Sequence, residues 1–193
     1  MSVNLTKGQK ISLDKEAGAT LNQVTMGLGW DAVKSKGFLG FGAKGADIDL
    51  DASCALFDDA GKPVDVVWFR QLKSRDGSVV HTGDNRTGAG DGDDEQINVS
   101  LQQVPATVKS IVFTVNSFTG QSFAQVQNAY CRLLDASSGK EVARFDLSVQ
   151  GEHNAQIMAK LYRHNGEWKL HAIGENGKGR TFDDLMPQIA QHL

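Results

Sequence analysis

Short apolar runs alternate with polar residues along most of the chain, and glycine-rich segments separate the runs. This pattern predicts many short strands joined by turns rather than long helices. Roughly eight to ten strands are expected, and they must share one core, which favours a two-sheet antiparallel β-sandwich. The fold class predicted is therefore all-β, with few short helices. The clearest strands are at residues 23–28, 48–56, 64–69, 96–101, 109–115, 142–147, 157–162 and 168–173.

Three turns can be predicted from their chemistry. Asn165-Gly166 separates two apolar runs and supplies the two positive-φ positions of a type I′ hairpin turn. The segments from Asp58 to Gly61 and from Asp135 to Gly139 each lie between strands and have the Asp-to-Gly spacing of a tight turn. Each pair of flanking runs is expected to form a hairpin.

Helix is expected at two places only. Residues 122–128 indicate a short helical turn, and the C-terminal segment repeats apolar residues at three- and four-residue intervals. Asp183 and Asp184 lie where the first turn of this second helix favours negative charge. The apolar positions of the C-terminal helix are Phe182, Leu185, Ile189 and Leu193.

Composition narrows the class of protein. The 193 residues, 40% of them hydrophobic, are enough for one domain over 1–193 with a full core. A net charge of −3 argues against nucleic acid as a main partner. No apolar stretch is long enough for a signal peptide or a membrane span, which predicts a cytoplasmic protein. Cys54 and Cys131 each lie in apolar runs and are expected to be reduced core thiols.

Residues 76–95 differ from the rest of the chain. They hold six carboxylates against one arginine, with five glycines between them. The glycines let the backbone fold tightly, and converging carboxylates repel one another unless a cation holds them. Calcium suits such a set of carboxylate, amide and carbonyl oxygens, magnesium is the second choice, and the histidine spacing argues against zinc. The alternative is a solvated acidic loop without an ion.

Further acids lie near strand ends. Asp47, Asp49 and Asp51 alternate with apolar residues, which places three carboxylates on one face of a strand. An ordinary half-exposed strand explains this pattern too. If the end of this strand lies beside the acidic loop, Asp47 or Asp49 can complete a second ion site. Asp31, at a strand exit after Trp30, can contribute in the same way.

Residues 83–95 resemble the signature of the TerD family of tellurium-resistance and stress proteins. The resemblance continues in order through residues 5–9, 27–31, 49–53, 125–129, 161–163 and 166–169. It implies a calcium-binding β-sandwich that helps bacteria to withstand tellurite, phages and colicins. It also implies about two bound Ca²⁺ ions, with six to eight oxygen ligands each.

The same resemblance implies the ion ligands and the partners. It implies assembly with other ter-system proteins, including an integral membrane protein similar to TerC, at the inner face of the cytoplasmic membrane. Asp76, Asp31 and Asp47 are further candidate ligands. The main candidate ligands are Asp84, Asn85, Asp91, Asp93, Asp94 and Glu95.

Sequence signals for catalysis are weak. The chain contains no G-x-x-x-x-G-K-[ST] phosphate loop and no G-x-S-x-G elbow. No catalytic residue and no organic cofactor are predicted, so a binding module is expected rather than an enzyme. The alternative is an enzyme or a small-anion or nucleotide-binding protein that uses the acidic loop or the glycine-rich segment 37–45. A thiol-based tellurite reductase is disfavoured, because neither cysteine has the surroundings of an activated thiol.

Overall fold

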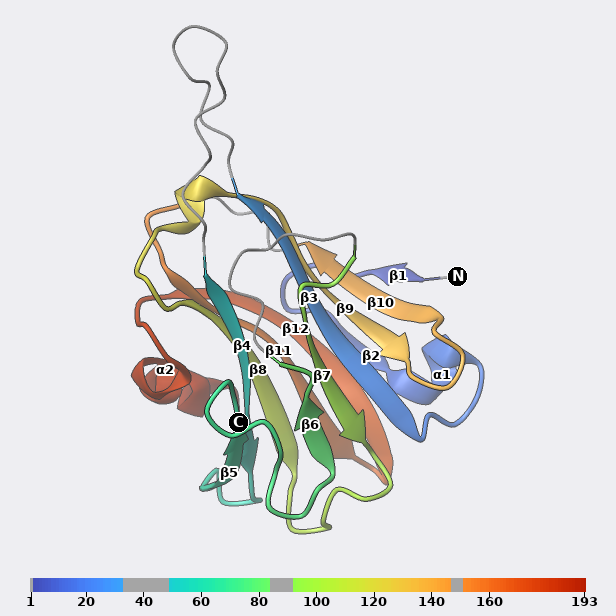
Figure 1. Cartoon of the computed structure of the whole chain (residues 1–193). Helices are drawn as coiled ribbons and strands as arrows, with labels where there is room; N and C mark the ends of the chain where they lie inside the picture. The colour runs from blue at the N-terminus through green and yellow to red at the C-terminus, as the bar shows by residue number, and fades with distance from the viewer. Residues whose placement is uncertain (1, 33–48, 84–91, 147–150) are drawn as a thin grey trace, which may run out of the picture.

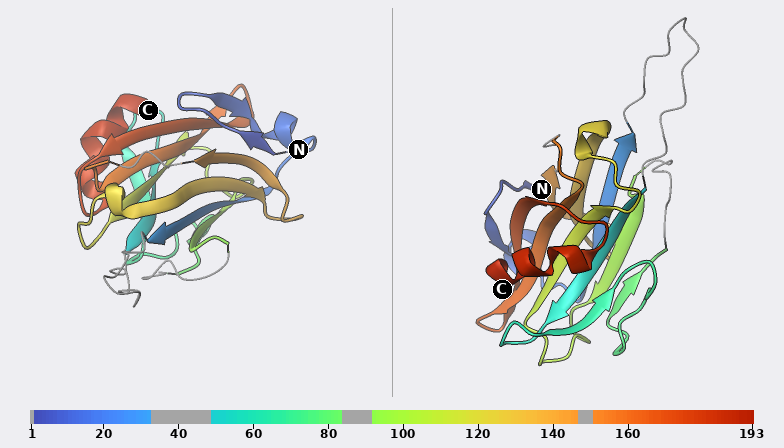
Figure 2. Two further views of the ribbon diagram at one scale, coloured as in Figure 1. Left: turned by 90° about the horizontal axis from the view of Figure 1, so that it is seen from above. Right: turned by 90° about the vertical axis from the view of Figure 1, so that its left-hand side faces the viewer.

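The computed structural model describes residues 2–32, 49–83, 92–146 and 151–193. These residues form two six-stranded sheets packed face to face, as Figures 1 and 2 show. Sheet A has the strand order β1-β10-β9-β3-β7-β6, and sheet B has the order β2-β12-β11-β8-β4-β5. The predicted two-sheet sandwich is confirmed, and every strand pair is antiparallel except β1 with β10.

The bounds of the elements are as follows. Sheet A contains β1 (Val3–Asn4), β3 (Gln23–Ala32), β6 (Val79–His81), β7 (Glu95–Ser100), β9 (Val126–Asp135) and β10 (Glu141–Asp146). Sheet B contains β2 (Lys10–Ser12), β4 (Leu50–Phe57), β5 (Pro63–Val67), β8 (Ser110–Ser117), β11 (Ala155–His164) and β12 (Glu167–Gly177). The helices are α1 (Leu13–Ala17), η1 (Phe123–Gln125), α2 (Phe182–Ile189) and η2 (Ala190–His192).

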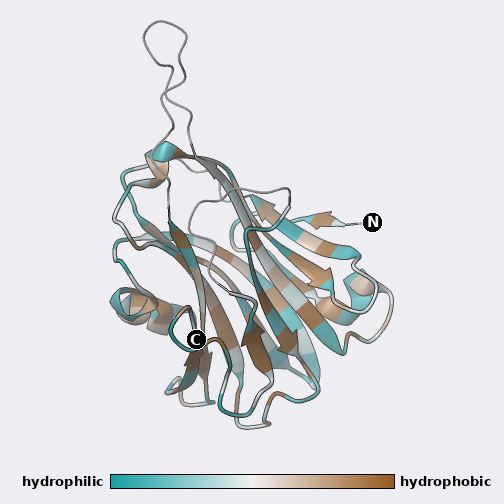
Figure 3. Cartoon of the chain, in the orientation of Figure 1, coloured by the Kyte–Doolittle hydropathy of each residue, from teal (hydrophilic) through white to brown (hydrophobic). Residues whose placement is uncertain are grey.

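Two apolar clusters hold the layers together. The larger one fills the space between the sheets, where alternate residues such as Val24, Met26 and Leu28 of β3 point inward. Hydrophobic colour is correspondingly dense on the strands in Figure 3. The smaller cluster lies on the outer face of sheet B, where Leu185 and Ile189 of α2 are part of the cluster. Because α2 covers this face, β4 is buried along its whole length.

The predicted turns are confirmed. Asn165 and Gly166 have φ values of 52° and 80°, and they connect β11 to β12 with His164 opposite Glu167. The turns after Asp58 and Asp135 connect β4 to β5 and β9 to β10, and Gly61 has a φ of 74°. The C-terminal helix also forms where it was predicted, but its apolar stripe stops at Ile189, because Leu193 is 41% exposed.

Three elements differ from the prediction. Helix α1 was not expected, because its five residues carry too short a pattern to signal a helix. The helical turn expected at 122–128 is only three residues long, and β9 begins at Val126. Strand β6 lies inside the acidic segment, where a continuous loop was expected. Two further strands, β1 and β2, were not predicted.

The N-terminal residues connect the two sheets. Strand β1 pairs in parallel with β10 at one edge of sheet A, where Val3 lies opposite Ala143. A few residues later, β2 pairs with β12 at one edge of sheet B, where Lys10 lies opposite His171. Each strand therefore covers a sheet edge that would otherwise expose unpaired backbone groups.

Candidate functional site

The acidic segment is the connection of the β6–β7 hairpin. Strands β6 and β7 pair antiparallel, with His81 opposite Ile97. Beyond the last pair, the backbone N–H of Thr82 donates to the carbonyl of Gln96 at 2.9 Å. Both ends of the connection therefore leave the same place at the end of sheet A. Asp93, Asp94 and Glu95, which follow the connection, are called here the acidic edge.

Asp93 is anchored by side chains from sheet A. Its side chain has no exposed surface. Its Oδ1 accepts hydrogen bonds from Arg132 Nε at 2.7 Å and from the Tyr130 hydroxyl at 3.1 Å, and its Oδ2 accepts one from Gln96 at 3.2 Å. The hydrogen bond to Asp93 raises the pKa of Arg132, although partial burial lowers it. Asp93 is thus held mainly by protein donors.

Two glycines of β3 make room for this anchor. A Cβ atom added to Gly27 would lie 2.1 Å from Asp93 Oδ2, and one added to Gly29 would lie 2.5 Å from the ring of Tyr130. Any side chain at either position would displace these groups. The glycines allow a carboxylate and an aromatic ring to lie directly on the backbone of β3.

Asp94 continues the ladder between β7 and β3. Its backbone N–H donates to the Leu28 carbonyl at 2.8 Å, and its Oδ2 accepts the N–H of Trp30 at 2.9 Å. The register of β3 against β9 shifts between Gly29 and Asp31, so Trp30 lies at a bulge. A carboxylate therefore takes the place of a backbone acceptor next to this irregularity.

Glu95 and His81 connect sheet A to sheet B through the interior. Both side chains are fully buried, 3.4 Å apart between His81 Nε2 and Glu95 Oε2. Glu95 Oε2 accepts the N–H of Ala52 at 2.6 Å, and His81 Nε2 lies 3.2 Å from the Ala52 carbonyl. Strand β5 pairs with β4 only from Cys54 onward. The Glu95 and His81 side chains therefore hydrogen-bond to the backbone of Ala52 in place of a neighbouring strand.

The surrounding hydrogen bonds define the tautomer of His81. The backbone N–H of Gly83 donates to Nδ1 at 3.1 Å, so Nδ1 carries no proton. Nε2 then carries the proton and can donate to the Ala52 carbonyl. In this way the entry of the acidic connection, at Gly83, is tied through His81 to its exit at Glu95.

The start of β4 adjoins the acidic edge at Ala52. Ala52 contacts Glu95 directly, and Asp49 and Asp51 lie within three residues of it. Asp51 is 6% exposed, whereas a half-exposed strand face was the alternative. It lies opposite Asn116 of β8, which is also buried. Because Ala52 belongs to the core between the sheets, the Asp51 side chain points to the other face of β4, away from Glu95.

Asp76 lies elsewhere and has a different task. Strand β6 separates it from the acidic connection, a distance of about 10 Å for three extended residues. Its Oδ1 accepts hydrogen bonds from Ser78 N at 2.7 Å and from Ser74 Oγ at 3.1 Å. Burial raises the pKa of Asp76, but these hydrogen bonds outweigh it and the net pKa is lowered. The structure places Asp76 as the stabilising residue of its own turn.

The remaining candidates lie partly or wholly outside the described residues. Asp31 lies in β3 opposite Gln127, one residue beyond Trp30, so its backbone adjoins the acidic edge. Asp47, Asp84, Asn85, Asp91 and the glycine-rich segment 37–45 are outside the described ranges. Within those ranges, no three His, Cys, Asp or Glu side chains are grouped to hold a metal ion. A complete ion site must therefore include ligands from the other segments.

Sequence reasoning did not find the residues that hold the acidic edge. Arg132 and Tyr130 come from β9, which is distant in sequence, and His81 lies inside the acidic segment without belonging to a motif. The one available signal was the Gly27-Leu28-Gly29 pattern, because glycine inside a strand often marks a close approach of another group.

Both cysteines are buried thiols without a disulfide, as predicted. Burial raises the pKa of Cys54 far above its ordinary value and raises the pKa of Cys131 to about 12. A thiol of this kind stays protonated at neutral pH and reacts poorly as a nucleophile.

The sequence identifies the class of protein to which this sandwich belongs. The family model of the TerD domain matches residues 1–188, so the chain is a member of the TerD family. It is 53% identical over 189 residues to the tellurium resistance protein TerZ of Serratia marcescens, covering 97% of this chain and 96% of TerZ. It is also 43% identical over 187 residues to general stress protein 16U of Bacillus subtilis (strain 168), covering 93% of each. The chain thus belongs to a family of tellurium-resistance and stress proteins.

Solved structures agree with the fold. A homologue of the telluride resistance protein TerD from Streptomyces coelicolor A3(2) superposes with a TM-score of 0.71 at 18% identity, covering 89% of this chain and 98% of that one. At this identity the likeness concerns the fold alone. No helix in the described part of the chain combines the length and apolar character that crossing a membrane requires.

Proposed function

We propose that this chain is a calcium-binding module of a bacterial tellurium-resistance and stress-response system, and that it acts through ion-dependent assembly rather than catalysis. The supporting observation is the fixed stem of the acidic connection. Thr82 and Gln96 close the stem, and Asp93, Asp94 and Glu95 attach it to three different strands. The stem therefore fixes the two points, at Thr82 and Asp93, between which the acidic connection runs.

The donors at this end suit a hard cation. Asp94 offers carboxylate oxygens, the connection adds Asp84, Asn85 and Asp91, and Asp47 or Asp49 before β4 are candidates for a second site. Calcium accepts six to eight such oxygens in flexible geometry, while magnesium requires a stricter octahedron. About two Ca²⁺ ions fit two groups of ligands, one near β3 and one near β4, with Mg²⁺ as the second choice. The bound ion would neutralise carboxylates that otherwise repel one another.

Within the acidic edge, the three carboxylates are not equivalent. Both oxygens of Asp93 accept hydrogen bonds from side chains, and one oxygen of Glu95 is used by Ala52. Asp94 is only half-buried, whereas the side chains of Asp93 and Glu95 have no exposed surface. We infer that Asp94 is the direct ligand of this group, whereas Asp93 and Glu95 chiefly position the segment.

A binding role agrees with the state of the thiols. Both are buried with raised pKa values, so they are poorly suited to reduce an oxyanion. Ion binding that orders a loop can instead present a surface to a partner. We propose that the partners are other ter-system proteins, including a TerC-like membrane protein, and that the chain works in the cytoplasm or at the inner face of its membrane.

The test is calorimetric titration of chelator-stripped protein with CaCl₂ and then MgCl₂. We expect saturable calcium binding, and Asp94→Asn should weaken it by about tenfold or more, since a charged ligand contact contributes roughly 1.5–3 kcal/mol. Asp59→Asn removes the same charge from an exposed turn and is the matched control. Absence of calcium binding to the wild-type chain, or equal affinity in Asp94→Asn, would contradict the proposal.

Ion-dependent assembly needs a separate measurement. The chain would be co-purified with a TerC-like partner in calcium and then in a chelator. Association that is lost with chelator and restored by calcium supports a responsive module. Association that is indifferent to calcium would argue against this part of the proposal.

A further inference from the structure

Three basic residues form a row across sheet B. Lys10 of β2 lies directly opposite His171 of β12, and His171 lies directly opposite Lys160 of β11. The neighbouring residues Ile11, Leu161 and Leu170 belong to the core, so the basic side chains point to the outer face. Lys10 and Lys160 lie on either side of His171 and carry the positive charge of the row, and His171 adds to it when it is protonated.

The acidic residues nearby do not provide a counter-charge. Among the described residues, neither Lys10 nor Lys160 forms an ion pair. Glu175 is engaged by His192, with 2.7 Å between His192 Nε2 and Glu175 Oε2. Lys160 instead donates to the backbone carbonyl of His192, and its Nζ lies 5.1 Å from the centre of the Tyr162 ring.

More basic groups surround the row. Lys169 follows on the same face of β12, opposite Ser12 on one side and Tyr162 on the other. His192 of η2 approaches from the end of the chain. At the outer end of the sheet, Glu167 accepts a hydrogen bond from Ser12. A chain of net charge −3 thus concentrates positive charge on one part of one face.

The charges affect one another. The pKa of His171 is lowered to about 4, mainly by burial and to a smaller extent by the positive charges of Lys10, Lys160 and His192. Burial also lowers the pKa of Lys160, and Lys10 adds to this effect. Both shifts disfavour the positively charged form of the side chain. An anion placed between the side chains would favour that form and raise both pKa values.

We propose that Lys10, Lys160 and His171 form a binding site for a small oxyanion of the phosphate class. Two ammonium groups and one imidazole offer several N–H donors from three adjacent strands on one face, which suits an anion with three or four oxygens. The anion is either a free phosphate-type ion or the phosphate of a lipid headgroup. This site lies on the outer face of sheet B, and its charge is opposite to that of the acidic edge.

The first probe is sulfate, because its charge is constant between pH 5 and 8. Saturable binding to the full chain is expected in a calorimetric or NMR titration at pH 6, and Lys10→Gln and Lys160→Gln should each weaken it by about tenfold, the loss of one charge-assisted contact. Lys62→Gln, an exposed lysine in the β4–β5 turn, is the matched control. No saturable binding, or equal weakening in Lys62→Gln, would overturn the proposal.

The second measurement is the pH dependence. Bound sulfate favours protonated His171, so the pKa of His171 measured by NMR should rise when sulfate is added, and the affinity should increase as the pH falls from 7 to 5. The groups facing His171 are Lys10, Lys160 and His192, with Lys169 and Glu175 on its own strand. His171→Asn should remove most of this dependence. An unchanged His171 pKa in saturating sulfate would contradict the site.

The two sources of the anion are distinguished with vesicles. Phosphatidylcholine vesicles with and without phosphatidylglycerol are compared in a sedimentation assay, with inorganic phosphate as competitor. Binding to the anionic vesicles that Lys160→Gln abolishes assigns the site to a lipid headgroup. Sulfate and phosphate binding without vesicle binding assigns it to a free oxyanion.

Discussion

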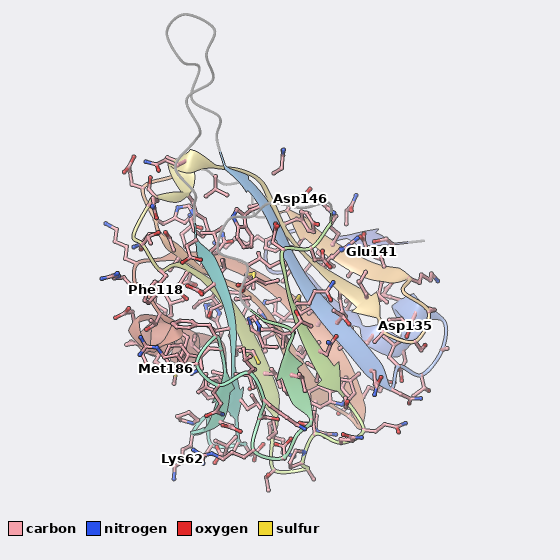
Figure 4. All side chains as sticks on the ribbon, in the orientation of Figure 1. Lys62, Phe118, Asp135, Glu141, Asp146 and Met186 are labelled. Atoms are coloured by element: carbon pink, nitrogen blue, oxygen red, sulfur yellow. The ribbon has the colours of Figure 1, made fainter. Side chains whose placement is uncertain are left out.

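The acidic edge and the basic row are both clusters of like charge, but the protein treats them in opposite ways. At the acidic edge, Asp93 accepts three hydrogen bonds and Glu95 is enclosed between the sheets. In the basic row, Lys10 and Lys160 face His171 without a carboxylate partner among the described residues. The count of charges in a segment therefore does not tell whether a cluster is satisfied. Figure 4 draws the described side chains on the ribbon and labels Lys62 and Asp135, which serve as control positions below.

The largest effect is expected from Asp93→Ala. The substitution removes the buried acceptor of Arg132, Tyr130 and Gln96, of which Arg132 keeps Glu141 and Tyr130 keeps the Gly92 carbonyl. Breaking a buried charged pair costs about 3–5 kcal/mol. Because Arg132 is 26% exposed, the lower end of this range is expected. Urea unfolding in the presence of a chelator measures the loss without any contribution from bound ions.

Asp135→Ala is the matched control for Asp93→Ala. Asp135 is half-buried at the start of the β9–β10 turn, and its side chain accepts hydrogen bonds from Ser137 and Ser138 of that turn. A loss of about 1 kcal/mol is expected for it. Equal losses of unfolding free energy in the two variants would show that the buried contacts of Asp93 stabilise the fold no more than an ordinary turn does.

A smaller loss is expected from Glu95→Ala. Removing the carboxylate leaves the buried Ala52 N–H without this acceptor, which costs about 2 kcal/mol. Glu95→Gln keeps an acceptor for Ala52 and should recover about half of this free energy. Differential melting of the three proteins checks the order. If Glu95→Gln were as unstable as Glu95→Ala, the hydrogen bond to Ala52 would not be the stabilising contact.

The smallest effect is expected from Lys10→Gln in the basic row, and this substitution should raise stability at low pH rather than lower it. Because the pKa of His171 is lowered from 6.5 to about 4 in the folded state, the unfolded chain binds a proton that the folded chain does not. The contribution is therefore zero above pH 6.5, and stability falls as the pH drops from 6.5 to about 4. Lys10→Gln should reduce this fall by about 0.5 kcal/mol, after allowance for solvent screening.

The measurement is a series of unfolding curves between pH 4 and 7 in a buffer without multivalent anions. Lys62→Gln, far from the row, should leave the pH dependence as in the wild type. A Lys10→Gln protein with an unchanged slope would show that Lys10 does not act on His171.

The sequence was sufficient for the features that depend on neighbouring residues. Asn165-Gly166 indicated its hairpin, and the apolar spacing of Phe182, Leu185 and Ile189 indicated α2. It was insufficient where the partner is distant. The Glu95–Ala52 hydrogen bond spans 43 positions and the Asp93–Arg132 bond spans 39, so no local pattern could reveal them. The acidic residues were found as a group, but their separate tasks depend on three strands.

The basic row was missed for a related reason. Lys10, Lys160 and His171 are each ordinary in their own strands, and only the register of three strands brings them together. Asp76 illustrates the reverse case, because its position near other acids suggested a shared role that the strand between them prevents.

The attachment of the N-terminal residues has a consequence for the order of events during synthesis. Strand β1 leaves the ribosome first, but it has no partner until Ala143 and Arg144 have been made, and β2 has none until residues 169–171 follow. The first dozen residues must therefore wait for most of the chain, and both sheets keep an open edge in the meantime. In a nascent chain stalled before β12, strand β2 would have no partner and the sheet edge would stay unpaired. That edge could then pair with a strand of another chain.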